Sequence, residues 1–110
     1  SSADQGPRMI AVFATVRAKP GRRDELIEAL RAGTVDDAAG EPGTIVHAMH
    51  ANLREEDLLH YYELYESKEA FITHAKVAGP KLNAVAHLVV GPPELVQTSL
   101  VVATGLPTSP

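Results

Sequence analysis

The 110-residue sequence contains no cysteine, and this absence excludes several kinds of site at once. Without thiols the chain forms no disulfide, holds no metal ion through thiolates and has no cysteine nucleophile. Because a reducing compartment suits a protein without disulfides, we expect a cytoplasmic protein. Tryptophan is also absent, which affects a motif described below.

Signals for nucleotide binding and for membrane insertion are missing as well. The sequence has neither the GxGxxG pattern of dinucleotide-binding folds nor the GxxxxGK[ST] pattern of phosphate-binding loops. Its apolar runs are too short to span a membrane. The net charge is −4 and no basic stripe stands out, so we expect no nucleic-acid partner. These absences favour chemistry on a small organic molecule without a cofactor.

Runs of β-branched, aromatic and other apolar residues predict the strands of the fold. We expect four strands, at residues 9–17, 44–51, 58–66 and 94–104. The polar residues 52–57 between the second and third strands are few enough for a hairpin loop. These two strands are therefore expected to pair in an antiparallel hairpin.

Apolar residues at helical spacing predict two longer helices and a shorter one. The first helix begins at Arg22, after a Pro-Gly turn. The second follows Ser67, a favourable N-cap, and places His74 on its apolar face. Gly and Pro at residues 79–80 are expected to end this helix. The third helix is expected over residues 82–89.

The order of these elements is typical of the ferredoxin-like, split βαβ arrangement. We predict an α+β fold in which helices cover one face of a four-stranded antiparallel sheet. The other face carries too many apolar residues for contact with water, so we predict a homodimer whose two sheets close into a dimeric α+β barrel. A single domain is expected over residues 9–104, with a flexible lead at 1–8 that lacks the layout of a signal peptide, and a tail at 105–110.

Three motifs together resemble the antibiotic biosynthesis monooxygenase family, whose members are dimeric α+β-barrel proteins. They are KPG at residues 19–21, EPGT at 41–44, and the segment that runs from YELYES at 62–67 through Ala70 to His74. The resemblance covers roughly residues 9–104. It implies a cofactor-independent monooxygenase that oxidises a phenolic, quinol or aromatic polyketide substrate with O2.

The sequence departs from the family pattern at three positions. Several family monooxygenases have tryptophan where this chain has Tyr65, and asparagine where it has Tyr61. The haem-degrading branch has asparagine at the position of Ala14, so haem is disfavoured. A protein that binds an aromatic ligand without turnover, and an isomerase or cyclase on the same fold, therefore stay open as alternatives.

Successive side chains of a strand point to opposite faces of the sheet, so Tyr61, Glu63 and Tyr65 of the third strand share one face. The family resemblance implies that this face is covered by the helices. The predicted catalytic residues are His74, Tyr65 and Tyr61. The predicted substrate-binding residues are His47, Met49, Phe71, Val12, Ala14 and Glu63. Together they predict a mostly apolar cleft with a few polar groups, which suits a small aromatic molecule and O2.

Each polar candidate also has a structural interpretation. His74 is a hydrogen-bonded core residue, a surface residue at the edge of its helix, or a base or orienting donor in a cavity. An ordinary pKa near 6.5 suits proton abstraction from a phenol at neutral pH. Tyr61 and Tyr65 either pack in the sheet or stack on a ligand. Glu63 must be paired or neutral if buried. No metal site is predicted, because His47 and His50 point to opposite faces of their strand.

Overall fold

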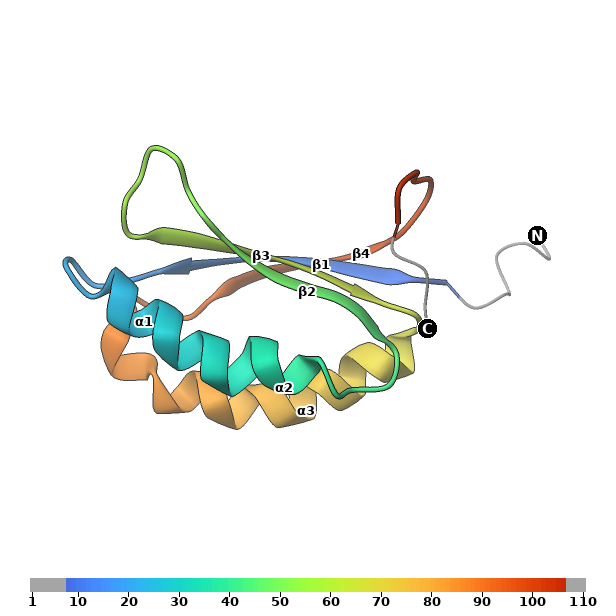
Figure 1. The fold of residues 1–110 in the computed structure, drawn as a ribbon, viewed down its shortest axis with the longest axis horizontal. Helices are drawn as coiled ribbons and strands as arrows, with labels where there is room; N and C mark the ends of the chain where they lie inside the picture. Colours follow the sequence, from blue (N-terminus) through green and yellow to red (C-terminus); the bar gives the residue numbers. More distant parts are fainter. Residues whose placement is uncertain (1–7, 107–110) are drawn as a thin grey trace.

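The computed structural model describes residues 8–106, so most of the predicted lead (1–8) and tail (105–110) lies outside the described residues. The helices and strands follow one another in the order shown in Figure 1. They are β1 (Ile10–Arg17), α1 (Arg23–Leu30), the π-helical turn η2 (Arg31–Val35), α2 (Asp36–Ala38), β2 (Thr44–Ala51), β3 (Leu58–Tyr65), α3 (Lys68–Ala84), the 3-10 turn η3 (Ala86–Leu88) and β4 (Glu94–Ser99). Among residues 8–106, no helix is long and apolar enough to cross a membrane.

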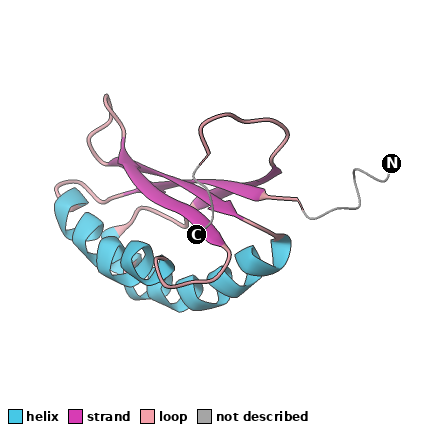
Figure 2. Ribbon diagram, turned by 45° about the vertical axis from the view of Figure 1, so that its right-hand side comes forward, coloured by secondary structure: helices cyan, strands magenta, loops and turns pink. Residues whose placement is uncertain are grey.

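Within the described residues, four strands form one antiparallel sheet in the order β2-β3-β1-β4. The helices lie together on one face of this sheet, as Figures 1 and 2 both show. The α+β prediction of a ferredoxin-like fold is therefore confirmed. Antiparallel pairing places Val12 opposite Glu63 and Ala14 opposite Tyr61, so these four side chains share the helix-covered face.

Two predicted boundaries were wrong. Helix α3 does not end at Gly79–Pro80 but continues to Ala84, and only the short turn η3 remains of the predicted third helix. Pro80 is exposed, so its ring points into solvent rather than into the core. Ala78 and Leu82, on either side of it, pack inwards, and the burial of their side chains outweighs the loss of one backbone hydrogen bond at the proline. The last strand ends at Ser99 rather than at residue 104, because its partner β1 begins at Ile10, opposite Ser99.

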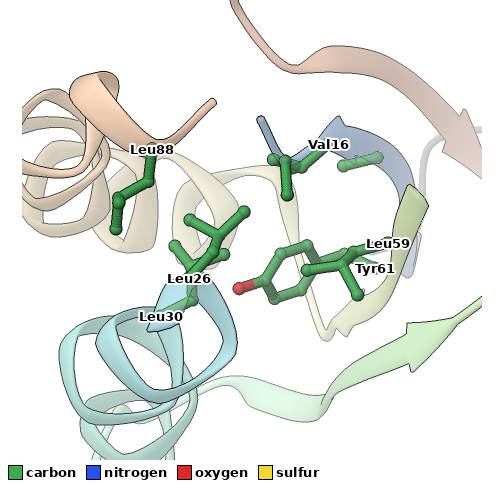
Figure 3. Close-up of a cluster of buried hydrophobic side chains, with 8 residues drawn as sticks. Val16, Leu26, Leu30, Leu59, Tyr61 and Leu88 are labelled. Atoms are coloured by element: carbon green, nitrogen blue, oxygen red, sulfur yellow. The ribbon is translucent and has the colours of Figure 1, made fainter. Parts of the chain in front are cut away.

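A hydrophobic cluster fills the space between α1 and the sheet. Figure 3 shows Leu26 and Leu30 of α1 facing Val16, Leu59 and Tyr61 of the sheet. Leu26 and Leu59 have no exposed surface at all. This cluster fixes the helices over the sheet.

The turn before β2 brings the backbone very close to the start of α3. Gly43 has a φ of +87°, and a Cβ added to it would lie 2.7 Å from the Cβ of Ala70. Gly21, in the turn before α1, has a similar φ of +76° but open space around it. Position 43 therefore requires glycine for two reasons, the positive φ of its backbone and its close contact with α3, whereas position 21 requires it only for the first.

The two glycines allow these effects to be separated. We expect Gly21→Ala to lower the free energy of unfolding by about 1 kcal/mol, through backbone strain alone. Gly43→Ala should lower it by about 3 kcal/mol, because the added methyl group also collides with Ala70. Urea unfolding of both variants measures the difference, and equal losses would contradict the close approach of the turn to α3.

Candidate active site

A cavity of about 230 Å³ lies between the sheet and α3. Its walls are mostly apolar, and small side chains leave the space open: Ala14 from β1 and Ala75, Ala78 and Gly79 from α3 all line it. The remaining lining residues are Val16, Thr34, His47, Tyr61, Glu63, Phe71, His74, Leu82, Pro93 and Leu95. A concave apolar site with a few polar groups is the usual form of a small-molecule site.

His74 is held in one orientation by Glu41. Its Nδ1 lies 2.7 Å from Glu41 Oε1, and since a carboxylate only accepts, Nδ1 carries the proton and donates it. The His74 side chain is 7% exposed and that of Glu41 17% exposed, so the pair is largely shielded from water. In the neutral imidazole, Nε2 is then an unprotonated acceptor. It faces Glu63, whose Oε1 is 3.9 Å away.

The turn that carries Glu41 is fixed from both sides. The Thr44 hydroxyl donates to Glu41 Oε1 over 3.1 Å, and the backbone N–H of Glu66 donates to the carbonyl of Gly43 over 2.9 Å. Ser67 accepts a hydrogen bond from the N–H of Ala70 and caps α3, which sets where His74 emerges. Local turn chemistry and a helix cap thus position both members of the pair.

Glu63 is a buried carboxyl group on β3. The hydroxyl of Tyr65 donates a short hydrogen bond to its Oε1. Burial raises the pKa of Glu63 above its ordinary value, while the hydrogen bond from Tyr65 and the nearby His74 act in the opposite direction. Burial also raises the pKa of Tyr65, and its contact with Glu63 raises it further. Tyr65 therefore stays a neutral donor at physiological pH.

His47, opposite Glu63 in the sheet, is the least satisfied polar side chain of the cavity. Its side chain is 4% exposed, its Nδ1 is buried without a hydrogen-bond partner, and its Nε2 lies 3.7 Å from Glu63 Oε2. Burial, followed by the neighbouring His74, lowers the pKa of His47 from 6.5 to about 4. Its ring packs 4.8 Å from that of His74 and 5.2 Å from that of Tyr61, measured between centroids. His47 is thus a neutral imidazole at neutral pH.

The hydroxyl of Tyr61 is hydrogen-bonded to Thr34, in the helical layer above the sheet. Thr34 Oγ1 donates to the carbonyl of Leu30 over 2.6 Å, so Tyr61 is the donor in its 3.1 Å hydrogen bond with Thr34. Burial raises the pKa of Tyr61 to about 12. Its hydroxyl is therefore a poor candidate for a base, while its ring remains available as a wall of the cavity.

Comparison with known proteins bears on the family to which the chain belongs. The family model described as antibiotic biosynthesis monooxygenase matches residues 9–78. The chain belongs to the antibiotic biosynthesis monooxygenase family. The resemblance drawn from the three sequence motifs is thereby confirmed. No curated protein matches this family member.

Several known structures share the fold of this monooxygenase-family chain. The "Putative antibiotic biosynthesis monooxygenase from Nitrosomonas europaea" is 18% identical with a TM-score of 0.80, covering 91% of this chain and 97% of its own. A second one, from Caulobacter crescentus CB15, is 25% identical with a TM-score of 0.78, covering 86% and 92%. A Bacteroides thetaiotaomicron protein described as a possible oxidoreductase is 20% identical with a TM-score of 0.75, covering 86% and 100%.

The structure gathers six of the nine predicted site residues around the cavity. They are Ala14, His47, Tyr61, Glu63, Phe71 and His74. The other three lie elsewhere. Val12 is fully buried and Met49 packs against the hydrophobic cluster around Leu59, so neither lines the cavity. Tyr65 is also fully buried, behind Glu63, with its ring 5.4 Å from Phe71 and 5.3 Å from His74.

Sequence reasoning missed several residues that the structure of this family member brings to the site. Glu41 is the most important, and its only signal was its place in the EPG motif. Thr34 lies in the π-helical turn, where helical periodicity is interrupted. Pro93 and Leu95 come from the connection to β4 and from β4 itself, which no local pattern linked to the cavity.

Replacing the two buried tyrosines tests the polar contacts. We expect Tyr61→Phe to lower the free energy of unfolding by about 1 kcal/mol, the typical cost of a neutral hydrogen bond. Tyr65→Phe should cost about 2 to 3 kcal/mol at neutral pH, because it leaves a buried carboxyl group without its donor.

The cost of Tyr65→Phe should also depend on pH. Losing the donor raises the pKa of Glu63 further, and a carboxyl group whose pKa is raised on folding destabilises the protein as pH increases through that pKa. The difference between wild type and Tyr65→Phe should therefore grow from acidic to neutral pH in urea unfolding. A difference that is constant with pH, or matches that of Tyr61→Phe, would contradict the Tyr65–Glu63 contact.

Proposed function

We propose that this protein is a cofactor-independent monooxygenase that oxidises a phenolic, quinol or aromatic polyketide substrate with O2. The observation that carries the proposal is His74 at the wall of an apolar cavity, hydrogen-bonded from behind to Glu41. Family membership supports it as well. The substrate of such an enzyme supplies the electrons for O2, and the protein supplies a base, orientation and exclusion of water.

The first step is proton removal from the substrate hydroxyl group. Nε2 of His74 accepts this proton, and the carboxylate of Glu41 stabilises the imidazolium through the hydrogen bond at Nδ1. A neutral His47 beside His74 avoids a second positive charge, and it also offers a hydrogen-bond partner to the substrate oxygen. The walls keep water away from the resulting phenolate, which makes it a better reductant.

The second step transfers oxygen. The phenolate gives one electron to O2, and the substrate radical and superoxide combine into a peroxide at an unsubstituted ring carbon. Loss of the proton on that carbon and cleavage of the O–O bond then give a quinone carbonyl and water. One oxygen atom of O2 ends in the product and the other in water, so no external reductant is consumed.

Cavity size bears on the substrate. An apolar protein cavity of about 150 Å³ can hold benzene, and the cavity here is about 230 Å³. One ring, or two fused rings, therefore fill the space beside His74. A larger polyketide fits only if its remaining rings extend past Pro93 and Leu95, where the wall is formed by β4 and the connection before it.

We also propose that the protein is a homodimer formed through the uncovered face of the sheet. Phe13 on β1 is 48% exposed and Val96, opposite it on β4, is 58% exposed. Tyr62 of β3 pairs with Phe13 as well, with ring centroids 5.6 Å apart. A contiguous apolar patch of this kind is typical of an interface. The cysteine-free composition supports a cytoplasmic location for the dimer.

Oxygen-dependent turnover is the direct test of the reaction. Incubation with a panel of phenols, hydroquinones and a dihydroanthracenone should give a quinone in air and no product under nitrogen. With ¹⁸O2, one labelled oxygen atom should appear in the product. His74→Asn should lower kcat by about 100-fold or more. Glu41→Gln should lower it by about tenfold, because Gln still accepts from Nδ1 but does not stabilise the imidazolium as well.

His87, which is exposed in the turn η3 and does not line the cavity, provides the matched control. His87→Asn should leave kcat unchanged. Turnover that continues under nitrogen would point instead to an isomerase or cyclase. Tight ligand binding without product in air would point to a binding protein.

Oligomeric state tests the dimer separately. We expect size-exclusion chromatography with light scattering to give twice the chain mass for the wild type. Phe13→Glu should shift the protein to monomer, because it places a charge in the centre of the apolar patch. Lys19→Glu in the exposed turn before α1 serves as a control for the added charge. A wild type that is monomeric at all concentrations would rule out the proposed interface.

A further inference from the structure

Three potential metal ligands meet at one side of the cavity. They are His47 on β2, Glu63 on β3 and His74 on α3. One nitrogen or oxygen atom of each lies within 4.8 Å of the others. All three residues line the cavity, so an ion held by them would face the space in which a small molecule binds.

The imidazole of His47 gives an independent indication of a missing partner. Its side chain is only 4% exposed, its Nδ1 has no hydrogen-bond partner among the described residues, and its Nε2 lies 3.7 Å from Glu63 Oε2, beyond hydrogen-bond distance. A buried polar group without a partner costs about 1 to 3 kcal/mol. A bound ion or water beside the ring is one explanation for such a group, and here the ion would bind at Nε2, next to the Glu63 carboxylate.

The side chains of the other two ligands, His74 and Glu63, are already held in place by hydrogen bonds from neighbouring residues. Glu41 accepts the Nδ1 proton of His74, which leaves Nε2 free to bind a metal ion. Tyr65 donates to Oε1 of Glu63, which leaves Oε2 facing His47. Metal-binding imidazoles and carboxylates usually have outer hydrogen bonds of this kind, which fix the orientation of the ligand atom.

The three ligand atoms lie within 4.8 Å of one another, which is wider than in a bound site. Nε2 of His47 is 3.7 Å from Glu63 Oε2, and Nε2 of His74 is 3.9 Å from Glu63 Oε1. Two ligands of a tetrahedral zinc ion are about 3.3 Å apart, given bonds of about 2.0 to 2.1 Å. Moving each imidazole inward by less than about 1 Å would close the site around an ion of this size.

We propose that His47, Glu63 and His74 form a binding site for one first-row divalent transition-metal ion, with an open coordination position towards the cavity. Two imidazoles and one carboxylate suit Zn²⁺, Fe²⁺ or Co²⁺, whereas Ca²⁺ and Mg²⁺ prefer oxygen ligands alone. The ion occupies Nε2 of His74, the same nitrogen that accepts the substrate proton in the proposed reaction. Metal binding and metal-free base catalysis therefore exclude each other, a consequence that rests on the proposed function.

Cobalt binding tests the site without any substrate. Protein freed of metal with EDTA and then dialysed should bind one Co²⁺ per chain and develop the visible absorption of a four- or five-coordinate ion. His47→Gln and Glu63→Gln should each weaken binding by at least about 100-fold, and Glu41→Gln by about 10- to 100-fold. His87→Gln, at an exposed histidine outside the cluster, should bind like the wild type.

A second measurement controls for variants that fold poorly. Zn²⁺ should raise the Tm of the wild type and of His87→Gln, but not that of His47→Gln, and circular dichroism without metal should show that each variant is folded. Absence of Co²⁺ binding by the wild type, or unchanged binding by folded His47→Gln and Glu63→Gln, would overturn the site. These readouts are independent of turnover, so a failure of the oxygenase proposal leaves them interpretable. Should turnover be found, added Zn²⁺ should abolish it, and full activity of the zinc-loaded protein would overturn the exclusion.

Discussion

The hydrogen bond between Glu41 and His74 joins parts of the chain that are 33 residues apart. It connects the turn before β2 to the middle of α3, across the end of the cavity. This one contact decides which nitrogen of His74 carries a proton and in which direction the other one points. The close approach of Gly43 to Ala70 and the cap at Ser67 both serve to keep the two residues within reach.

The site combines features that a stable core would avoid. The side chains of Glu63, His74 and His47 are all buried, and only the first two have hydrogen-bond partners among the described residues. Desolvation shifts the pKa of Glu63 upwards and that of His47 downwards, so both groups are driven towards their neutral forms. The hydrophobic cluster under α1 adjoins the cavity, since Ala14, Val16 and Tyr61 belong to both, and it supplies the stability that lets the protein retain these buried polar groups.

The sequence predicted the parts of the site that depend on strand periodicity. Alternation along the third strand brings Tyr61 and Glu63 to one face, and in the structure His47 pairs opposite Glu63 on that helix-covered face. Contacts between distant segments were not predictable in this way. Glu41 reaches His74 only because the turn folds against α3, and α3 continues through Pro80 only because inward packing on both sides of the proline outweighs its local preference. Met49 lies on the same face of β2 as His47, yet it packs against the hydrophobic cluster rather than the cavity. Alternation along a strand predicts the face of a side chain but not its position along that face.

The π-helical turn after α1 has a consequence for how the chain tolerates changes in length. A π-turn accommodates one more residue than the α-helix around it, and here the extra residue turns Thr34 inwards to Tyr61. Asp37, just beyond the turn, forms an ion pair with Lys81 of α3. Deleting one residue from Arg31–Val35 would remove the extra residue that the π-turn absorbs, so the segment would become a regular α-helix and the residues after it would keep nearly the same phase. The cost of the deletion would fall on the contact between Thr34 and Tyr61, because Thr34 would no longer turn inwards to the Tyr61 hydroxyl.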